Sequence, residues 1–292
     1  ENVGTLSNPS FEYITNNYAG TDSLQVNGLY PSMGDLDGDG DVDMICGLQN
    51  GTLSYFENKG GAGNPVLWVS PIDSFFYINT GSRSAPQLVD LDRDSDLDLV
   101  VGSRNATISY YENTGTATSP AFSAQSGTNN PLDSVTAHLM AINQGFQNTE
   151  LEPHFAFADL DGDGDMDCFV SINAYHNDPM SDYLWYYENI GTTTGPVFSS
   201  TPSSNMLGGY SIQNFSRTPM PFVYDNNGSY ELFIGHLQGN IIQLGNIEGN
   251  ILGTYDTLSM NFKDFYEGAN TNISMADLNN DNKLDYIFGT GR

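Results

Sequence analysis

The sequence predicts an all-β protein, a β-propeller built from four-stranded antiparallel blades, on three observations. An acidic string of nine residues recurs along the 292-residue chain, a second landmark string follows most copies, and short β-type runs with glycine-rich turns lie between them. Recurrence at a regular step is the signature of repeat architectures, and each step here is about the length of one propeller blade. A flat β-sandwich is the weaker alternative, because it does not explain a fixed repeat.

The acidic string and the landmark string keep the same order in each repeat. The acidic copies are DLDGDGDVD (35–43), DLDRDSDLD (90–98), DLDGDGDMD (159–167) and DLNNDNKLD (277–285), with a degenerate relative, VYDNNGSYE (223–231). The landmark copies are SYFENKGG (54–61), SYYENTGT (109–116), WYYENIGT (185–192) and the worn IQLGNIEG (242–249). Coincidence does not produce such an ordered series.

Within one repeat, four short runs read as strands. In the second repeat they are PQLVDLD, LDLVVGS, ATISYYEN and PAFSAQ, and no segment of the chain shows competing helical periodicity. Asn50-Gly51 and the aligned Asn105-Ala106 fall between the second and third runs, where a two-residue hairpin needs residues that tolerate positive φ. We therefore expect up-and-down sheets arranged radially.

The predicted domain is a single propeller over residues 1–292, with about five repeats. The chain opens at ENVGT, a landmark string without its preceding strand, and stops at Arg292 before the next landmark is due. We interpret this as a fragment of a longer array, cut within a repeat at both ends. The approximate repeats are 1–28 (partial), 29–83, 84–150, 151–216, 217–270 and 271–292 (partial).

Composition excludes several classes of partner. Thirty-six acidic residues stand against eight Lys and Arg, for a formal charge of −28 and a pI near 4.1. This field repels nucleic acids and anionic lipid, and no apolar run is long enough to span a membrane, so we expect neither nucleic-acid binding nor direct membrane insertion. Cys46 and Cys168 each lie in a short apolar run, which favours buried thiols over a disulfide.

The acidic strings are predicted to bind calcium. Side-chain oxygens at positions 1, 3, 5 and 9, with the backbone carbonyl of position 7, form a hard oxygen ligand set, and position 6 needs a left-handed conformation. An EF-hand is excluded because its glutamate at position 12 is missing. About four ions are expected, and weak or no binding at 223–231, where Val223 replaces the first ligand. The predicted metal residues are Asp35, Asp37, Asp39, Asp41, Asp43, Asp90, Asp92, Asp94, Asp96, Asp98, Asp159, Asp161, Asp163, Asp165, Asp167, Asp277, Asn279, Asp281, Lys283 and Asp285.

At these residues the chain resembles the FG-GAP or VCBS-type repeats of integrin α-subunit propellers and of many secreted bacterial proteins. The resemblance extends to Phe288-Gly289 and to Gly81 followed by Ala85-Pro86. It implies a propeller of usually seven blades, with calcium in the loop between the first and second strands of a blade. It also implies an extracellular protein, secreted or attached to the cell surface, and it is unspecific for function.

Two insertions, near 136–150 and 173–183, are predicted to emerge on the face opposite calcium and to form a ligand-binding surface. The predicted ligand-binding residues are Asn143, Gln144, Phe146, Gln147, Tyr175, His176, Asp178 and Tyr183. We expect a noncatalytic adhesion or recognition module rather than an enzyme. The expected partner of this module is a protein, a glycan or another domain of its parent protein. The alternative is a calcium-dependent polysaccharide lyase or hydrolase in which His154, His176 or an unpaired acidic residue acts as acid or base.

Overall fold

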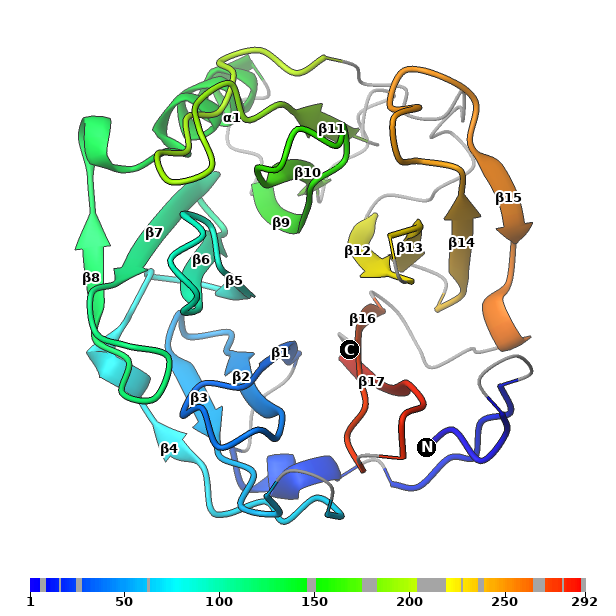
Figure 1. Ribbon diagram of the computed structural model, residues 1–292. Coiled ribbons are helices and arrows are strands. Elements are labelled where there is room, and N and C mark those ends of the chain that lie inside the picture. The colour runs from blue at the N-terminus through cyan, green and yellow to red at the C-terminus, as the bar shows by residue number, and fades with distance from the viewer. Residues whose placement is uncertain are drawn as a thin grey trace.

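A computed structural model of the chain shows a ring of five antiparallel sheets (Figure 1). The ring confirms the predicted all-β propeller, and each sheet is one blade. The structure describes residues 1–5, 9–15, 17–24, 28–61, 64–145, 151–174, 183–203, 219–226, 228–235, 239–264, 271–279 and 281–289.

Each of the first four blades runs from an inner strand outward in sequence order. Blade 1 contains β1 (Tyr30–Gly34), β2 (Asp43–Gly47), β3 (Leu53–Phe56) and β4 (Ile72–Asp73). Blade 2 contains β5 (Ala85–Val89), β6 (Asp98–Ser103), β7 (Thr107–Asn113) and β8 (Phe122–Gln125), and blade 3 contains β9 (Leu151–Ala158), β10 (Asp167–Ala174) and β11 (Tyr183–Tyr187). Blade 4 contains β12 (Met220–Asp225), β13 (Tyr230–Gly235), β14 (Ile241–Gly245) and β15 (Asp256–Ser259), and blade 5 contains β16 (Asn272–Ala276) and β17 (Asp285–Gly289).

The four runs predicted as strands in the second repeat are confirmed as β5 to β8. The predicted hairpin turns are confirmed as well, because Gly51 and Ala106 both have positive φ, 86° and 61°. Short 3-10 helices lie at Tyr18–Leu24, Phe75–Tyr77, Gly127–Asn129 and Phe262–Asp264.

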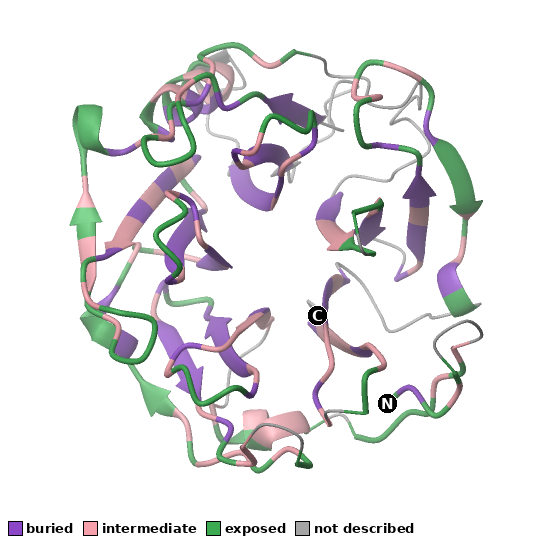
Figure 2. Ribbon diagram, in the orientation of Figure 1, coloured by how far each residue is buried: buried purple, intermediate pink, exposed green. Residues whose placement is uncertain are grey.

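The hydrophobic core lies between neighbouring blades rather than at the centre of the ring. Ile45, Leu53 and Leu99 pack between blades 1 and 2, and Val100 and Phe155 pack between blades 2 and 3. Inner and middle strands are accordingly buried, whereas outer strands such as β4 and β15 are exposed (Figure 2). Cys46 and Cys168 are buried free thiols within these layers, as predicted.

Blade 5 packs against blade 1, so the five blades of the described residues close into a ring. Met44, Cys46 and Phe56 of blade 1 form a core cluster with Ile287 of β17. The Ser274 hydroxyl of β16 donates a hydrogen bond of 2.9 Å to the Pro31 carbonyl. The ring of this chain therefore has fewer blades than the seven that the family resemblance implies.

The half repeats at the two chain ends belong to one blade. The amide of Asn2, in the N-terminal landmark ENVGT, donates a hydrogen bond of 2.7 Å to Oδ1 of Asp285, the first residue of β17. The N-terminal segment and β17 both lie in this sector of the ring (Figure 1).

Glycine lies at or next to the end of the second strand in four of the described blades, where the start of the next inner strand passes close by. A Cβ at Gly47 would lie 2.0 Å from the Ser84 carbonyl oxygen, and one at Gly102 would lie 2.1 Å from that of Pro153. Gly235 and Gly289 are equally crowded, by Thr271 and Leu29. Blade 3 carries Ser171 at this position, and its hydroxyl donates to the Pro219 carbonyl. The glycine that follows the acidic repeat thus allows successive blades to pack.

The expectation that no segment shows competing helical periodicity is wrong for one segment. Residues Asp133–Gly145 form α1, which begins near the end of blade 2 and packs against β7. Leu132, Val135 and Leu139 are fully buried in the core between blades 2 and 3, at the spacing of one helical face. Among the described residues, no helix is long and apolar enough to span a membrane.

Candidate metal centres

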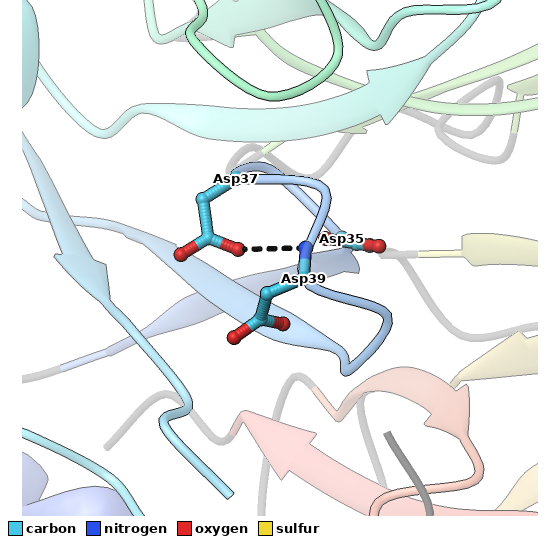
Figure 3. A group of neighbouring side chains, drawn as sticks. All are labelled: Asp35, Asp37 and Asp39. Carbon is cyan, nitrogen blue, oxygen red and sulfur yellow. Dashed lines mark hydrogen bonds between the residues drawn. The ribbon is translucent and has the colours of Figure 1, made fainter. Parts of the chain in front are cut away.

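Three acidic loops each gather carboxylates at one point. We name them loop 1 (35–43), loop 2 (90–98) and loop 3 (159–167), after their blades. In each loop one carboxylate oxygen from positions 1, 3 and 5 lies within 4.8 Å of the others; these residues are Asp35, Asp37 and Asp39, then Asp90, Asp92 and Asp94, then Asp159, Asp161 and Asp163. Figure 3 shows the group in loop 1.

Backbone amides fix the shape of each loop. In loop 1 the amides of Gly38 and Gly40 donate to the two oxygens of Asp35 at 2.7 and 3.0 Å, and the Asp39 amide donates to Asp37 at 3.2 Å. Gly40, at position 6, has φ of 89°, a left-handed conformation that glycine adopts without strain. The carboxylates are thus held in a tight turn by the chain itself.

Position 7 places a further buried carboxylate in each loop. Asp41, Asp96 and Asp165 are buried, and their Oδ1 atoms have no hydrogen-bond partner among the described residues. Desolvation by burial raises the pKa of each to about 6, and repulsion from neighbouring aspartates of the same loop adds to the shift. The prediction for position 7 used only the backbone carbonyl, whereas the structure also places its side chain in the loop.

The residues of loops 1 to 3 fit a hard divalent cation. Two negative charges 4.8 Å apart repel by roughly 3 kcal/mol at an effective dielectric constant of about 20, and each loop holds several such pairs. A buried oxygen without a partner costs additional free energy. A cation with oxygen ligands removes both penalties, and carboxylates without His or Cys select calcium or magnesium over zinc or copper.

Position 9 is occupied by hydrogen bonds within the protein. Oδ1 of Asp43 accepts from the Asn58 amide at 2.8 Å, and Oδ2 accepts from the Leu36 amide at 3.0 Å and the Tyr55 hydroxyl at 2.8 Å. Burial raises the pKa of Asp43 to about 6. In this structure the residue links the start of the loop to the third strand.

The same link recurs around the ring. Asp98 accepts from Asn113 at 2.8 Å and from the Tyr110 hydroxyl at 2.8 Å, and Asp167 accepts from Asn189 at 2.9 Å. Sequence reasoning used the asparagine of the ENxG string only as a marker of register and missed this role. The constant offset between that asparagine and position 9 in the first two repeats was the available signal.

The remaining two acidic strings differ from loops 1 to 3. The degenerate string forms a short hairpin in which Asp225 pairs with Tyr230, and Val223 lies within β12. In 277–285, here loop 5, the Lys283 ammonium lies 2.6 Å from Oδ2 of Asp281 and donates to the Asn2 carbonyl at 2.8 Å. Position 9 of loop 5, Asp285, makes the usual link, to Asn2.

The predicted ligand-binding residues are only partly within the described chain. Asn143 and Gln144 lie near the end of α1, and Tyr183 begins β11. Phe146, Gln147, Tyr175, His176 and Asp178 lie outside the described residues. The proposed surface therefore stays a prediction.

A cavity of about 200 Å³ adjoins loop 1 on the same face of the ring. Its lining residues are Leu36, Asp37, Tyr55, Glu57, Phe75 and Pro120. The Tyr55 and Phe75 rings stack with centroids 4.8 Å apart, and Pro120 comes from blade 2. The cavity lies at the boundary of two blades.

Comparison with known proteins identifies the repeat. Residues 35–101 and 90–170 match the FG-GAP-like repeat. None of the curated proteins compared with this chain matches it. One similar solved structure is the catalytic domain of a GH62 α-L-arabinofuranosidase from Coprinopsis cinerea, with 13% identity over 93% of this chain and 87% of that chain and a TM-score of 0.47.

This last finding overturns the prediction that the chain is not an enzyme. That structure is described as a catalytic domain, and a fold by itself does not decide whether a protein is catalytic. At 13% identity and a TM-score of 0.47, the comparison transfers no activity and no substrate to this chain.

Proposed function

The chain is an FG-GAP repeat β-propeller, and we propose that it is an extracellular recognition module stabilised by calcium. The observation that carries the calcium assignment is the unpartnered, buried Oδ1 of position 7 beside three converging carboxylates in loops 1 to 3. Calcium sites of extracellular modules commonly have affinities of about 10⁻⁴ to 10⁻³ M, and they fill only where calcium is abundant. Metal binding then contributes directly to folding stability.

We place recognition at the centre of the face opposite loops 1 to 3. The inner strands β1, β5 and β9 end at these loops, so their first residues lie at the other end of the ring. There the Tyr30 ring of β1 lies 5.3 Å from the His154 ring of β9, centroid to centroid, although blades 1 and 3 are not neighbours. The side chains of the two blades therefore meet across the ring.

A buried ion pair lies beside these rings. Arg83, which precedes β5, has Nη1 2.7 Å from Oε1 of Glu152, and the Glu152 side chain is only 2% exposed. Glu152 and His154 are two residues apart on β9 and so lie on the same side of the strand. A buried ion pair is a poor source of stability compared with apolar packing, which favours a functional reason for its presence.

His154 adds a polar atom that the described protein does not satisfy. Its Nε2 is buried without a hydrogen-bond partner. Burial lowers the pKa of His154 to about 4, so the imidazole is neutral at physiological pH and can donate or accept one hydrogen bond at this nitrogen. An arginine donor, a carboxylate acceptor, a neutral imidazole and an aromatic ring together suit a ligand rich in hydroxyl groups, such as a glycan, or a polar protein segment.

The proposal is tested by binding of the calcium-loaded protein to a glycan array and to intact cells, with His154→Ala compared with the wild type. Glu57→Gln, which changes the cavity on the calcium side, is the matched control. We expect His154→Ala to weaken binding at least tenfold with an unchanged fold by circular dichroism, and Glu57→Gln to bind like the wild type.

Other results would overturn parts of the proposal. Loss of binding in Glu57→Gln alone would move recognition to the cavity beside loop 1. No binding by the wild type to any glycan or cell would contradict a recognition function, and cleavage of a bound oligosaccharide would show a catalytic one.

A further inference from the structure

Loop 5 carries a cation of its own at the position where the other loops carry a buried aspartate. Lys283 stands at position 7, and its ammonium lies 2.6 Å from Oδ2 of Asp281, the position 5 carboxylate. The same ammonium donates a hydrogen bond of 2.8 Å to the Asn2 carbonyl. The Lys283 side chain is 20% exposed and the Asp281 side chain 33% exposed, so the contact is partly open to water.

The charge of loop 5 differs sharply from that of loops 1 to 3. Positions 1, 3, 5 and 7 are all aspartates in each of loops 1 to 3, whereas in loop 5 they are Asp277, Asn279, Asp281 and Lys283. When these groups are ionised, the four positions carry a net charge of −4 in each of loops 1 to 3 and of −1 in loop 5. Calcium affinity depends on the number of charged ligands, and an ammonium bonded to one of the two remaining carboxylates repels a divalent ion.

The lysine also links two segments from opposite ends of the sequence. In blades 1 to 3 the landmark asparagine follows its acidic loop along a continuous chain, so the blade's own hairpins hold it in place. In blade 5 this asparagine is Asn2, which no covalent path within the blade connects to β17. The Lys283 ammonium donates a hydrogen bond to the carbonyl of Asn2, and the Asp285 carboxylate accepts one from the amide of Asn2 at 2.7 Å.

We propose that loop 5 is not a calcium site and that the Lys283 ammonium takes the place of the ion. The described residues of loop 5 share two features with loop 1: positive φ at position 6, here Asn282, and a hydrogen bond from the amide of that residue to the carboxylate at position 1, here Asp277. The lysine neutralises the loop and fastens the N-terminal segment to blade 5, so ring closure does not depend on calcium. The inference rests on the proposal that loops 1 to 3 bind calcium, and it reduces the expected number of ions from four to three.

Native mass spectrometry of the whole chain in calcium-containing buffer tests the inference by counting bound ions. The wild type should hold three. Asp35→Asn in loop 1 should hold two, and the matched Asp277→Asn in loop 5 should still hold three. Lys283→Asp restores an acid at position 7 and should hold four.

The outcomes separate this inference from the proposed function. A fourth ion in the wild type that Asp277→Asn removes would overturn the inference, and so would a folded Lys283→Asp variant that holds only three. A wild type without bound calcium, or a count that Asp35→Asn leaves unchanged, would instead overturn the calcium assignment of loops 1 to 3. If Lys283→Asp does not fold, the comparison of Asp277→Asn with Asp35→Asn decides.

Discussion

The two faces of the ring are built on different plans. On the face of the acidic loops, the same bond recurs in blades 1, 2 and 3, from the landmark asparagine to position 9 at 2.8 to 2.9 Å. On the opposite face, the Arg83–Glu152 pair and the Tyr30–His154 contact each occur once in the described residues. Repetition thus marks what the fold needs, and the single-copy polar cluster marks what distinguishes this protein from others with the same fold.

Calcium removal should lower Tm more than any other change considered below. It should act only on the face of the ring that carries the acidic loops. Three sites with affinity near 10⁻⁴ M contribute about 4 kcal/mol at about 1 mM calcium, which corresponds to a fall in Tm on the order of 10 °C on chelation. Differential scanning calorimetry with EDTA, followed by addition of excess calcium, measures it. An unchanged Tm after chelation would show that the loops are stable without metal.

Arg83→Met should destabilise the opposite face to a lesser extent. It leaves the Glu152 carboxylate buried without its ion-pair partner, which costs about 3 kcal/mol. The loss of Tm should be equal with calcium and with EDTA, because the pair lies away from the loops. Lys59→Met, in the exposed pair with Glu57, is the control and should cost less than about 1 kcal/mol. A loss seen only in calcium would couple the two faces.

Asp43→Asn tests the role of position 9. The substitution replaces one of two acceptor oxygens that hold Asn58, Leu36 and Tyr55, and should cost about 2 kcal/mol. If position 9 acts mainly as a link between strands, chemical denaturation shows this loss in EDTA as well as in calcium. Asp35→Asn should differ, with its loss confined to calcium-containing buffer. Identical behaviour of the two variants would place Asp43 among the metal ligands.

Without metal, the stability of the protein should fall as pH rises. For each titrating group, this is the smallest of the four expected effects on stability. Desolvation by burial raises the pKa of Asp98 and Asp167 to about 7, above the ordinary value near 4. The folded state then binds protons more tightly than the unfolded state, so this contribution to stability is present at low pH and is lost as pH rises from about 4 to 7. In EDTA, Tm should therefore be higher at pH 5 than at pH 8.

Calcium should reverse that order, because metal binding requires ionised carboxylates. Tm measured at both pH values with and without calcium checks the crossing. Parallel pH profiles in the two buffers would show that the raised pKa values of these aspartates and calcium binding are unconnected.

The loop face was predictable from sequence because its chemistry repeats. The acidic strings and the ENxG strings placed the strands of blade 2 and the converging aspartates of loops 1 to 3. The position 9 link was missed because an aspartate in an acidic string reads as a ligand, and only the fold shows that Asn58 lies next to Asp43.

The features outside the repeat were harder to predict. The sequence does carry a signal for the helix α1, because Leu132, Val135 and Leu139 are spaced as on one face of a helix. This signal was overlooked because it occurs once, among segments that read as strands. The ring closes through a hydrogen bond between Asn2 and Asp285, near the two ends of the sequence. A local sequence pattern does not predict a contact between residues so far apart. The Arg83–Glu152 pair likewise joins blades 2 and 3 across 69 positions.

Hydrogen–deuterium exchange with and without calcium tests the contrast between the faces most directly. Calcium should slow exchange at loops 1, 2 and 3 and at the landmark turns that follow them, because the ion orders each loop and its linked turn. Exchange at loop 5, and at the first residues of β1 and β9 on the opposite face, should not change. Protection that rises equally in loop 5, or that does not rise in loops 1 to 3, would contradict the account.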